Sequence, residues 1–162
     1  MKKIFLLAVI AIMGLGAVSC SKDDDSTSNF STDIKGNWKE SKIVCLDKDK
    51  KVLGEKMASD NDGCGVDAIK FDNKEGVFTY NFKDMVKNEC VKREYNVTYY
   101  VLLDALITQE KGSSEANPEE FKIVELTKNK LVLFSYEKLD PDSVKDLKYP
   151  TGTVYTQSVY VK

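Results

Sequence analysis

The chain has 162 residues, with 24 Lys and Arg against 26 Asp and Glu, so its formal net charge is only −2. It contains no histidine and one arginine, Arg93, and its lysines do not gather into a basic patch. This composition argues against a nucleic-acid-binding protein, and the absence of histidine removes the commonest general base and metal ligand. We therefore expect a protein that is not an enzyme and that holds no metal or cofactor.

The first 19 residues predict a secretory signal peptide. Lys2 and Lys3 give a basic start, and the apolar run after them is shorter than the roughly 20 residues that cross a ~30 Å hydrocarbon core. Residues 17–20, Ala-Val-Ser-Cys, resemble the lipobox of bacterial lipoproteins, although Ala17 stands where that motif usually has leucine. The resemblance implies cleavage before Cys20 and acylation of its thiol. The alternative is an ordinary signal peptide followed by an unrelated cysteine.

The acidic segment after Cys20 indicates a tether. Cys-Ser-Lys-Asp-Asp-Asp resembles the export tag on surface lipoproteins of Bacteroidota, which implies a lipid-anchored protein of the outer membrane that is exposed at the cell surface. The same aspartates also keep a linker solvated and extended. We assign residues 20–33 to the lipidated cysteine and a linker too polar to bury itself, and residues 34–162 to one folded domain.

The rest of the chain predicts an all-β fold. Short segments rich in β-branched and aromatic residues are separated by turn residues. These strand candidates are residues 38–46, 69–71, 77–82, 93–101, 105–109, 121–126, 131–136 and 153–161. A turn at 72–76 is expected to use a positive φ at Gly76, and residues 142–147 predict a short helix after Pro141. About eight strands favour an antiparallel β-barrel, with a β-sandwich as the alternative.

Three cysteines lie beyond the anchor. An exported protein meets oxidising surroundings, so we expect one disulfide among Cys45, Cys64 and Cys90, for which three pairings are possible. We favour Cys64 with Cys90, which would close a loop of about 25 residues and stabilise the fold by roughly 3 kcal/mol. Cys45 lies in an apolar stretch and is expected to be a small buried hydrophobe.

Residues 34–39, Ile-Lys-Gly-Asn-Trp-Lys, resemble the start of lipocalin-like domains. Two later stretches, residues 64–80 and 126–133, resemble the lipocalin-like lipoproteins of Bacteroidota. The resemblance implies a barrel of the lipocalin type, in which Gly36 and Trp38 open the first strand and the tryptophan plugs one end. Lipocalins often place an arginine of the last strand against this tryptophan. Here Lys162 would be a poor substitute, because it lacks a planar guanidinium.

The same resemblance implies an interior that could hold a ligand. The side chains that could line it are Glu40, Tyr80, Tyr95, Tyr99 and Tyr155. Tyrosines offer an apolar body and a hydroxyl that orients a guest, but in a filled barrel they would simply be core. Glu40 and Lys42 are polar groups inside the barrel if their face of the first strand points inward. A bulge that switches the face would make them surface charges.

These observations lead to two functional hypotheses. The first is a surface lipoprotein that contacts the membrane through Cys20 and binds a small, largely apolar molecule in its barrel. The second is a structural or interaction subunit of a cell-surface complex, with a filled barrel, no ligand and a surface protein as its partner. A cavity of roughly several hundred Å³ with a few inward polar groups would favour binding.

Overall fold

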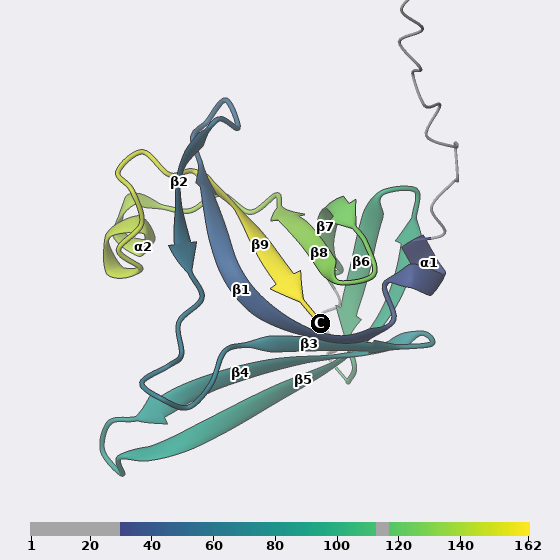
Figure 1. Cartoon of the computed structure of the whole chain (residues 1–162), viewed down its shortest axis with the longest axis horizontal. Helices are drawn as coiled ribbons and strands as arrows, with labels where there is room; N and C mark the ends of the chain where they lie inside the picture. The colour runs from purple at the N-terminus through teal and green to yellow at the C-terminus, as the bar shows by residue number, and fades with distance from the viewer. Residues whose placement is uncertain (1–29, 113–116) are drawn as a thin grey trace, which may run out of the picture.

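The computed structural model describes residues 30–112 and 117–162, which form a nine-stranded antiparallel sheet closed into a barrel (Figure 1). Cys20 and the expected signal peptide lie outside these residues. The strands are β1 (Gly36–Leu46), β2 (Val52–Met57), β3 (Ala68–Asp72), β4 (Glu75–Asp84), β5 (Glu89–Leu102), β6 (Ala105–Glu110), β7 (Glu119–Leu126), β8 (Lys130–Ser135) and β9 (Tyr155–Val161). Pairing of β1 with β9 closes a ring of eight strands, and β2 pairs with β1 outside that ring. The predicted antiparallel barrel is confirmed.

β1 is long enough to pair with three other strands. Its first residues pair with β3, its second half pairs with β2, and its other edge pairs with β9. β2 was not predicted as a strand. Its side chains are mostly exposed and follow no simple apolar alternation, because the strand lies outside the barrel and buries little surface.

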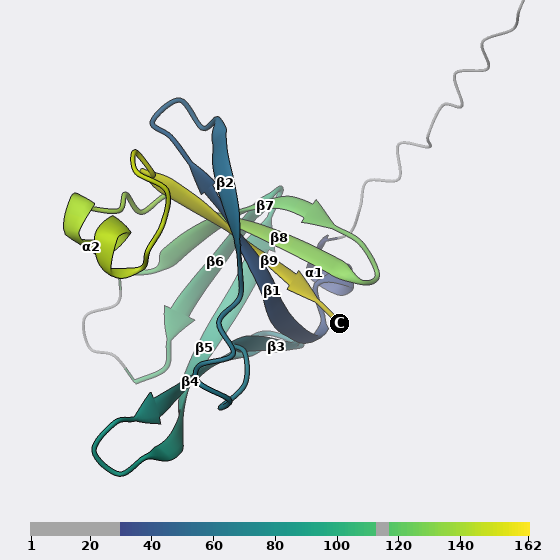
Figure 2. The same ribbon diagram turned by 60° about the vertical axis from the view of Figure 1, so that its left-hand side comes forward.

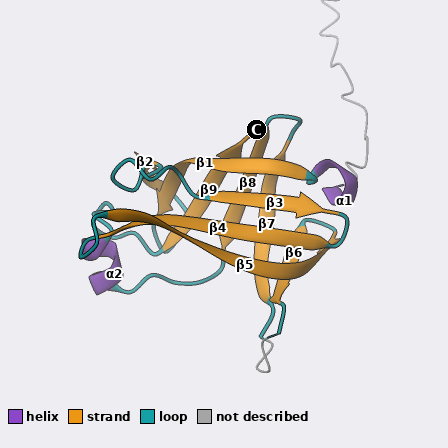
Figure 3. Cartoon of the chain, turned by 90° about the horizontal axis from the view of Figure 1, so that it is seen from below, coloured by secondary structure: helices purple, strands orange, loops and turns teal. Residues whose placement is uncertain are grey.

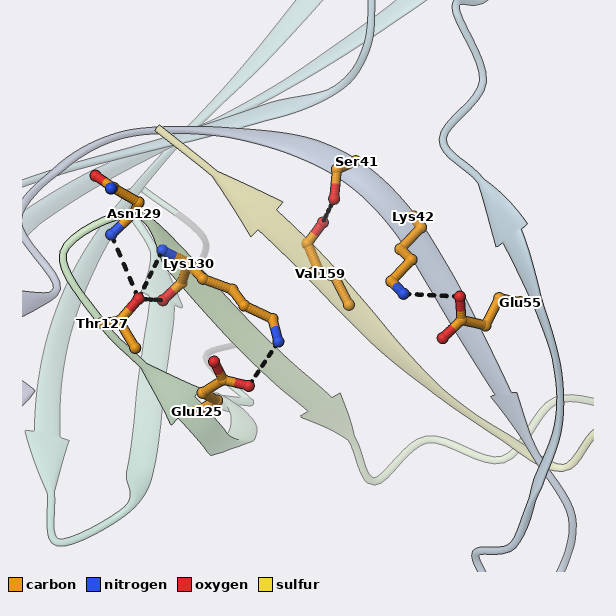
Figure 4. Close-up of polar contacts among 8 residues, drawn as sticks. All are labelled: Ser41, Lys42, Glu55, Glu125, Thr127, Asn129, Lys130 and Val159. Atoms are coloured by element: carbon orange, nitrogen blue, oxygen red, sulfur yellow. Dashed lines mark hydrogen bonds and ion pairs between the residues drawn. The ribbon is translucent and has the colours of Figure 1, made fainter.

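A bulge at Ser41 changes which side of β1 faces the interior. Glu40 opposes Tyr160 of β9, whereas Lys42 opposes the next residue, Val159, so Ser41 is the extra residue. The Ser41 hydroxyl donates to the Val159 carbonyl at 3.1 Å (Figure 4). The side chain of Lys42 therefore leaves the barrel, and its ammonium lies 2.7 Å from a carboxylate oxygen of Glu55 on β2.

The main core fills the barrel interior. It is built from one buried face of each strand of the ring except β4 and β9, which contribute partly buried side chains. Its fully or nearly buried members are Ile34, Trp38, Ile69, Phe71, Tyr99, Leu106, Ile123, Leu131 and Leu133. A second cluster lies on the outer face of β1, β8 and β9, because its members alternate with inward residues. It comprises Val44, Leu46, Val132, Phe134 and Val159, with Tyr155 packed against it.

Two short helices lie at opposite ends of the strands (Figure 3). α1 (Phe30–Asp33) precedes β1, and α2 (Pro141–Asp146) lies between β8 and β9. The α2 helix begins where predicted, after Asp140, whose carboxylate accepts hydrogen bonds from the backbone N–H groups of residues 142 and 143. The fold includes residues before Ile34, because Phe30 packs against the barrel core. Burial of the apolar Phe30 ring compensates for the polar residues that follow it in the sequence.

The β4–β5 hairpin projects beyond the rest of the barrel (Figure 2). The predicted disulfide between Cys64 and Cys90 is present, and it ties the β2–β3 connection to the start of β5 at the far end of this hairpin. Cys45 is a buried free thiol. The expected positive φ at Gly76 is wrong, since Asn73 adopts it instead at 50°. Gly76 lies within β4, where an added Cβ would come within 3.0 Å of Val97.

Candidate functional site

One end of the barrel is closed by Trp38. Its indole is fully buried, and its Nε1–H donates to the carbonyl of Ile34 at 2.6 Å. Gly36 connects α1 to β1 with a φ of +131°, a backbone conformation that side chains strongly disfavour. Lys162 follows β9 and places its ammonium 4.3 Å from the centroid of a Trp38 ring. Lys162, which we expected to be a poor substitute for an arginine, thus makes a cation–π contact with the tryptophan without stacking a planar group.

The interior next to Trp38 is packed with large side chains. The rings of Phe71 and Tyr99 have centroids 4.8 Å apart in an edge-to-face arrangement. The Tyr99 hydroxyl is buried and has no hydrogen-bond partner among the described residues. Burial raises the pKa of Tyr99, and the charge of Asp72 adds to this effect. Tyr99 is therefore part of the core at this end and offers no surface to a ligand.

Glu40 lies farther along the interior, on the inward side of the bulge. Burial raises the pKa of its carboxyl, and the nearby charge of Asp67 raises it further. Its cross-strand partner Tyr160 is half-buried, and burial of the phenol together with the charge of Glu40 raises the pKa of Tyr160. A cavity of about 40 Å³ lies beside Tyr160 and Ser158. The carboxylate and the hydroxyls form a polar layer between the packed end and the rest of the barrel.

Beyond this layer the interior opens into a cavity of about 500 Å³, the mouth cavity. Cross-strand register explains its lining: along β4, Phe78 opposes Tyr95 and Tyr80 opposes Arg93. These pairs extend the inward face of the barrel onto the projecting hairpin. The complete lining is Phe78, Tyr80, Phe82, Arg93, Tyr95, Val97, Thr108, Glu110, Asn117 and Glu119.

Four of the ten residues that line the mouth cavity are aromatic, and the others are mostly polar or charged. The rings of Tyr80 and Tyr95 meet edge to face with centroids 5.6 Å apart. The guanidinium carbon of Arg93 lies 5.0 Å from the centroid of Phe82, and no carboxylate among the described residues forms an ion pair with Arg93. The site therefore combines apolar rings with one cation and the carboxylates of Glu110 and Glu119.

A second hollow of about 540 Å³, the side cavity, adjoins the mouth cavity. Both cavities are lined by Tyr80 and Glu119. The remaining walls of the side cavity come from the start of β7 and from the end of β8 with the residues that follow it: Glu120, Phe121, Ser135, Tyr136 and Glu137. Two strands of the ring, β4 and β7, thus present residues to both hollows.

A family model described as a lipocalin-like domain matches residues 34–133. The chain belongs to this family. The comparison with solved structures finds a lipocalin-like protein from Bacteroides uniformis that is 13% identical, covering 80% of this chain and 98% of that one with a TM-score of 0.47. No curated protein matches the chain.

The lipocalin-like barrel places the side chains named from the sequence in different environments. Tyr80 and Tyr95 line the mouth cavity. Tyr99 belongs to the packed core, and Tyr155 lies on the outer face against the second cluster, because it opposes the outward Leu46. Glu40 faces inward but does not border either large cavity.

The polar residues of the site that were not predicted from the sequence include Arg93 and Glu119. Arg93 could have been placed from the sequence, because it lies two residues before Tyr95 on the same strand, and side chains two residues apart face the same side. Glu119 could be placed only once β7 was paired with β6, where it opposes the buried Thr108.

The described residues contain no group of three or more acidic, cysteine or histidine side chains that could hold a metal ion. In residues 30–112 and 117–162, neither helix has the length and apolar character needed to span a bilayer.

Proposed function

We propose that this protein is a surface lipoprotein whose barrel binds a small amphipathic molecule in the mouth cavity. The observation that carries the proposal is the cavity itself, because its volume of about 500 Å³ falls within the range of roughly 300–1,000 Å³ typical of ligand pockets. Its lining of rings with a few convergent polar groups is also typical of such pockets. We further propose that the role is binding rather than catalysis.

The division of the interior supports this function over a purely structural one. The end that contains Trp38 and Phe71 is filled by large side chains, as the structural hypothesis requires of the whole barrel. Toward the other end the inward residues of β4 and β5 are just as large, yet Tyr80 and Tyr95 are 46% and 38% exposed. Exposed inward rings are costly to leave in water, which favours a ligand that covers them.

The site is best tested with N-phenyl-1-naphthylamine, a neutral apolar probe whose fluorescence rises when it leaves water. We expect saturable binding to the wild-type protein. Tyr95→Ala should weaken the affinity by roughly twofold to tenfold, because it removes one ring from the wall. The matched control is Tyr100→Ala, since Tyr100 is on the same strand but faces outward and is 59% exposed. No saturable binding, or equal losses in the two variants, would refute the proposed site.

The membrane anchor is a separate part of the proposal. It is supported by the basic start, the short apolar run and the Ala-Val-Ser-Cys sequence ending at Cys20. At least two acyl chains on Cys20 would hold the barrel at the outer membrane, whereas one chain binds only marginally. Cys20→Ala should release the protein into the soluble fraction, whereas Cys45→Ala, which alters a buried thiol of the barrel, should not. Retention of the Cys20 variant in the membrane would contradict lipid anchoring.

A further inference from the structure

The mouth cavity and the side cavity together form one groove. They share Tyr80 from β4 and Glu119 from β7, so a chain-shaped ligand that passes between these two side chains would occupy both hollows. Tyr80 is about half exposed, packs against Tyr95 and is not part of the packed core, so we expect its ring to be able to move aside. A ligand longer than either cavity can therefore be accommodated.

The charge along this groove is predominantly negative. Glu110 and Glu119 border the mouth cavity, and Glu119, Glu120 and Glu137 border the side cavity, against a single cation, Arg93. None of these carboxylates forms an ion pair within the part of the chain that the structure describes, although six other ion pairs occur there. Within the described residues, four carboxylates therefore line the groove against one cation.

The phenol of Tyr80 responds to this negative charge. Burial raises its pKa, and the carboxylate with the largest further effect is Glu119, followed by Asp67. A field that disfavours a phenolate at the junction of the two cavities also disfavours an anionic ligand there. The same field stabilises a cation.

The walls of the groove add a second attraction for cations. Tyr80, Tyr95 and Tyr136 each present a ring to one of the hollows. Tyr80 and Tyr95 carry no cation on their faces among the described residues, whereas Phe82 is already covered by Arg93. Aromatic faces attract ammonium groups, most strongly when water is excluded. Rings and carboxylates within one groove are the chemistry that recognises an organic cation.

We propose that the ligand of this groove is an amphipathic ammonium compound, with its cationic head beside Tyr80 and Glu119 and its apolar chain along the aromatic walls. This inference rests on the proposed function of the mouth cavity and specifies the charge of the ligand. The positive charge of Arg93 repels a cationic head group, so Arg93 lowers the affinity of the groove for cations.

The test compares ligands that differ only in their heads. Decyltrimethylammonium, decanol and decyl sulfate, each below its micelle concentration, are titrated against the protein loaded with N-phenyl-1-naphthylamine. We expect the cation to displace the probe at a lower concentration than decanol, and decyl sulfate to be the weakest. Added salt should reduce the advantage of the cation. Equal potency of the three compounds, or an advantage of the anion, overturns the inference and leaves the proposed function intact.

Two substitutions give effects of opposite sign. Glu119→Gln should weaken binding of decyltrimethylammonium by roughly fivefold, the contribution of one charge about 4 Å away in water. Arg93→Gln should strengthen it by a similar factor. Glu89→Gln serves as the control, since Glu89 is exposed at the far end of the hairpin and borders neither cavity. Unchanged affinity in both groove variants overturns the inference.

A failure of the proposed function is recognised separately. If the neutral probe does not bind, calorimetric titration with decyltrimethylammonium decides the matter directly. Binding that is weakened in Glu119→Gln would support the cation site without an apolar cavity. Binding that is equal in wild type and Glu119→Gln, or no heat of binding, would overturn both proposals.

Discussion

In a Cys64→Ala, Cys90→Ala double variant, the β2–β3 connection is no longer joined to the far end of the β4–β5 hairpin. The two cysteines are separated by 26 positions in the chain. On the chain-entropy model, a loop of this length stabilises the folded state by about 3.5 kcal/mol. We expect a measured loss of about 2–3.5 kcal/mol, because the end of the hairpin can fray without unfolding the barrel.

The lower part of that range follows from the exposure of the hairpin end. Met85 and Val86 at the turn are 81% and 95% exposed, so local opening there sacrifices little buried apolar surface. Once the disulfide is gone, the unfolded chain gains freedom. The folded chain also gains some, and the two effects partly cancel.

Urea denaturation monitored by tryptophan fluorescence measures this loss. Trp38 is the only tryptophan and is buried at the opposite end of the barrel, so its signal reports unfolding of the barrel rather than fraying of the hairpin. The variant should also bind N-phenyl-1-naphthylamine less tightly, because Phe82 lies one residue pair from Cys90 and lines the mouth cavity. Equal unfolding free energies and equal probe affinities in the two proteins would refute this reasoning.

Four further outcomes concern the closed end and the buried acids, all measured by urea denaturation. Gly36→Ala should cost roughly 1–3 kcal/mol, because φ is +131° and the new Cβ would lie 2.9 Å from Lys162. Lys162→Ala should cost about 0.5–1 kcal/mol through lost contact with Trp38, whereas Lys162→Arg should not. The pKa of Glu40 is raised above 4.5 in the folded state, so the wild-type protein loses stability as pH rises above that value. Glu40→Gln should therefore be more stable than wild type near pH 7. The difference should vanish toward pH 4. Burial raises the pKa of Tyr149 to about 12, so stability should fall between pH 10 and 12, and less steeply in Tyr149→Phe.

The strands of the ring could be predicted because each has one face in a continuous core. Period-two alternation is strong where one side of a strand meets apolar neighbours and the other meets water. β2 lacks this signal, because Val52 and Met57 remain exposed. Phe30 was assigned to a polar linker, since a single aromatic residue gives no periodicity and its burial depends on the distant core that it contacts.

The inward face of a strand is harder to predict when the register shifts. Glu40 and Lys42 are two residues apart and would face the same side of a regular strand, yet the bulge at Ser41 places them on opposite sides of the sheet. Which residue forms a bulge depends on the partner strand, and β9 lies more than a hundred residues away in the chain. Tyr155 was assigned to the interior for a related reason: its face is set by its pairing with Leu46, not by its own sequence neighbours.

The position of the mouth cavity follows from the unequal lengths of the strands. Trp38 and Phe71 fill the barrel where β1, β3 and β4 all contribute residues. β3 has only five residues and its pairing with β4 reaches no farther than Thr79, whereas β4 and β5 continue to pair with each other as far as Asp84 and Glu89. This part of the hairpin therefore has no β3 beside it. Large side chains that would complete a core in a shorter hairpin therefore become the walls of a hollow. A ligand of the proposed kind would enter from this end, because the indole of Trp38 and the ring of Phe30 fill the other.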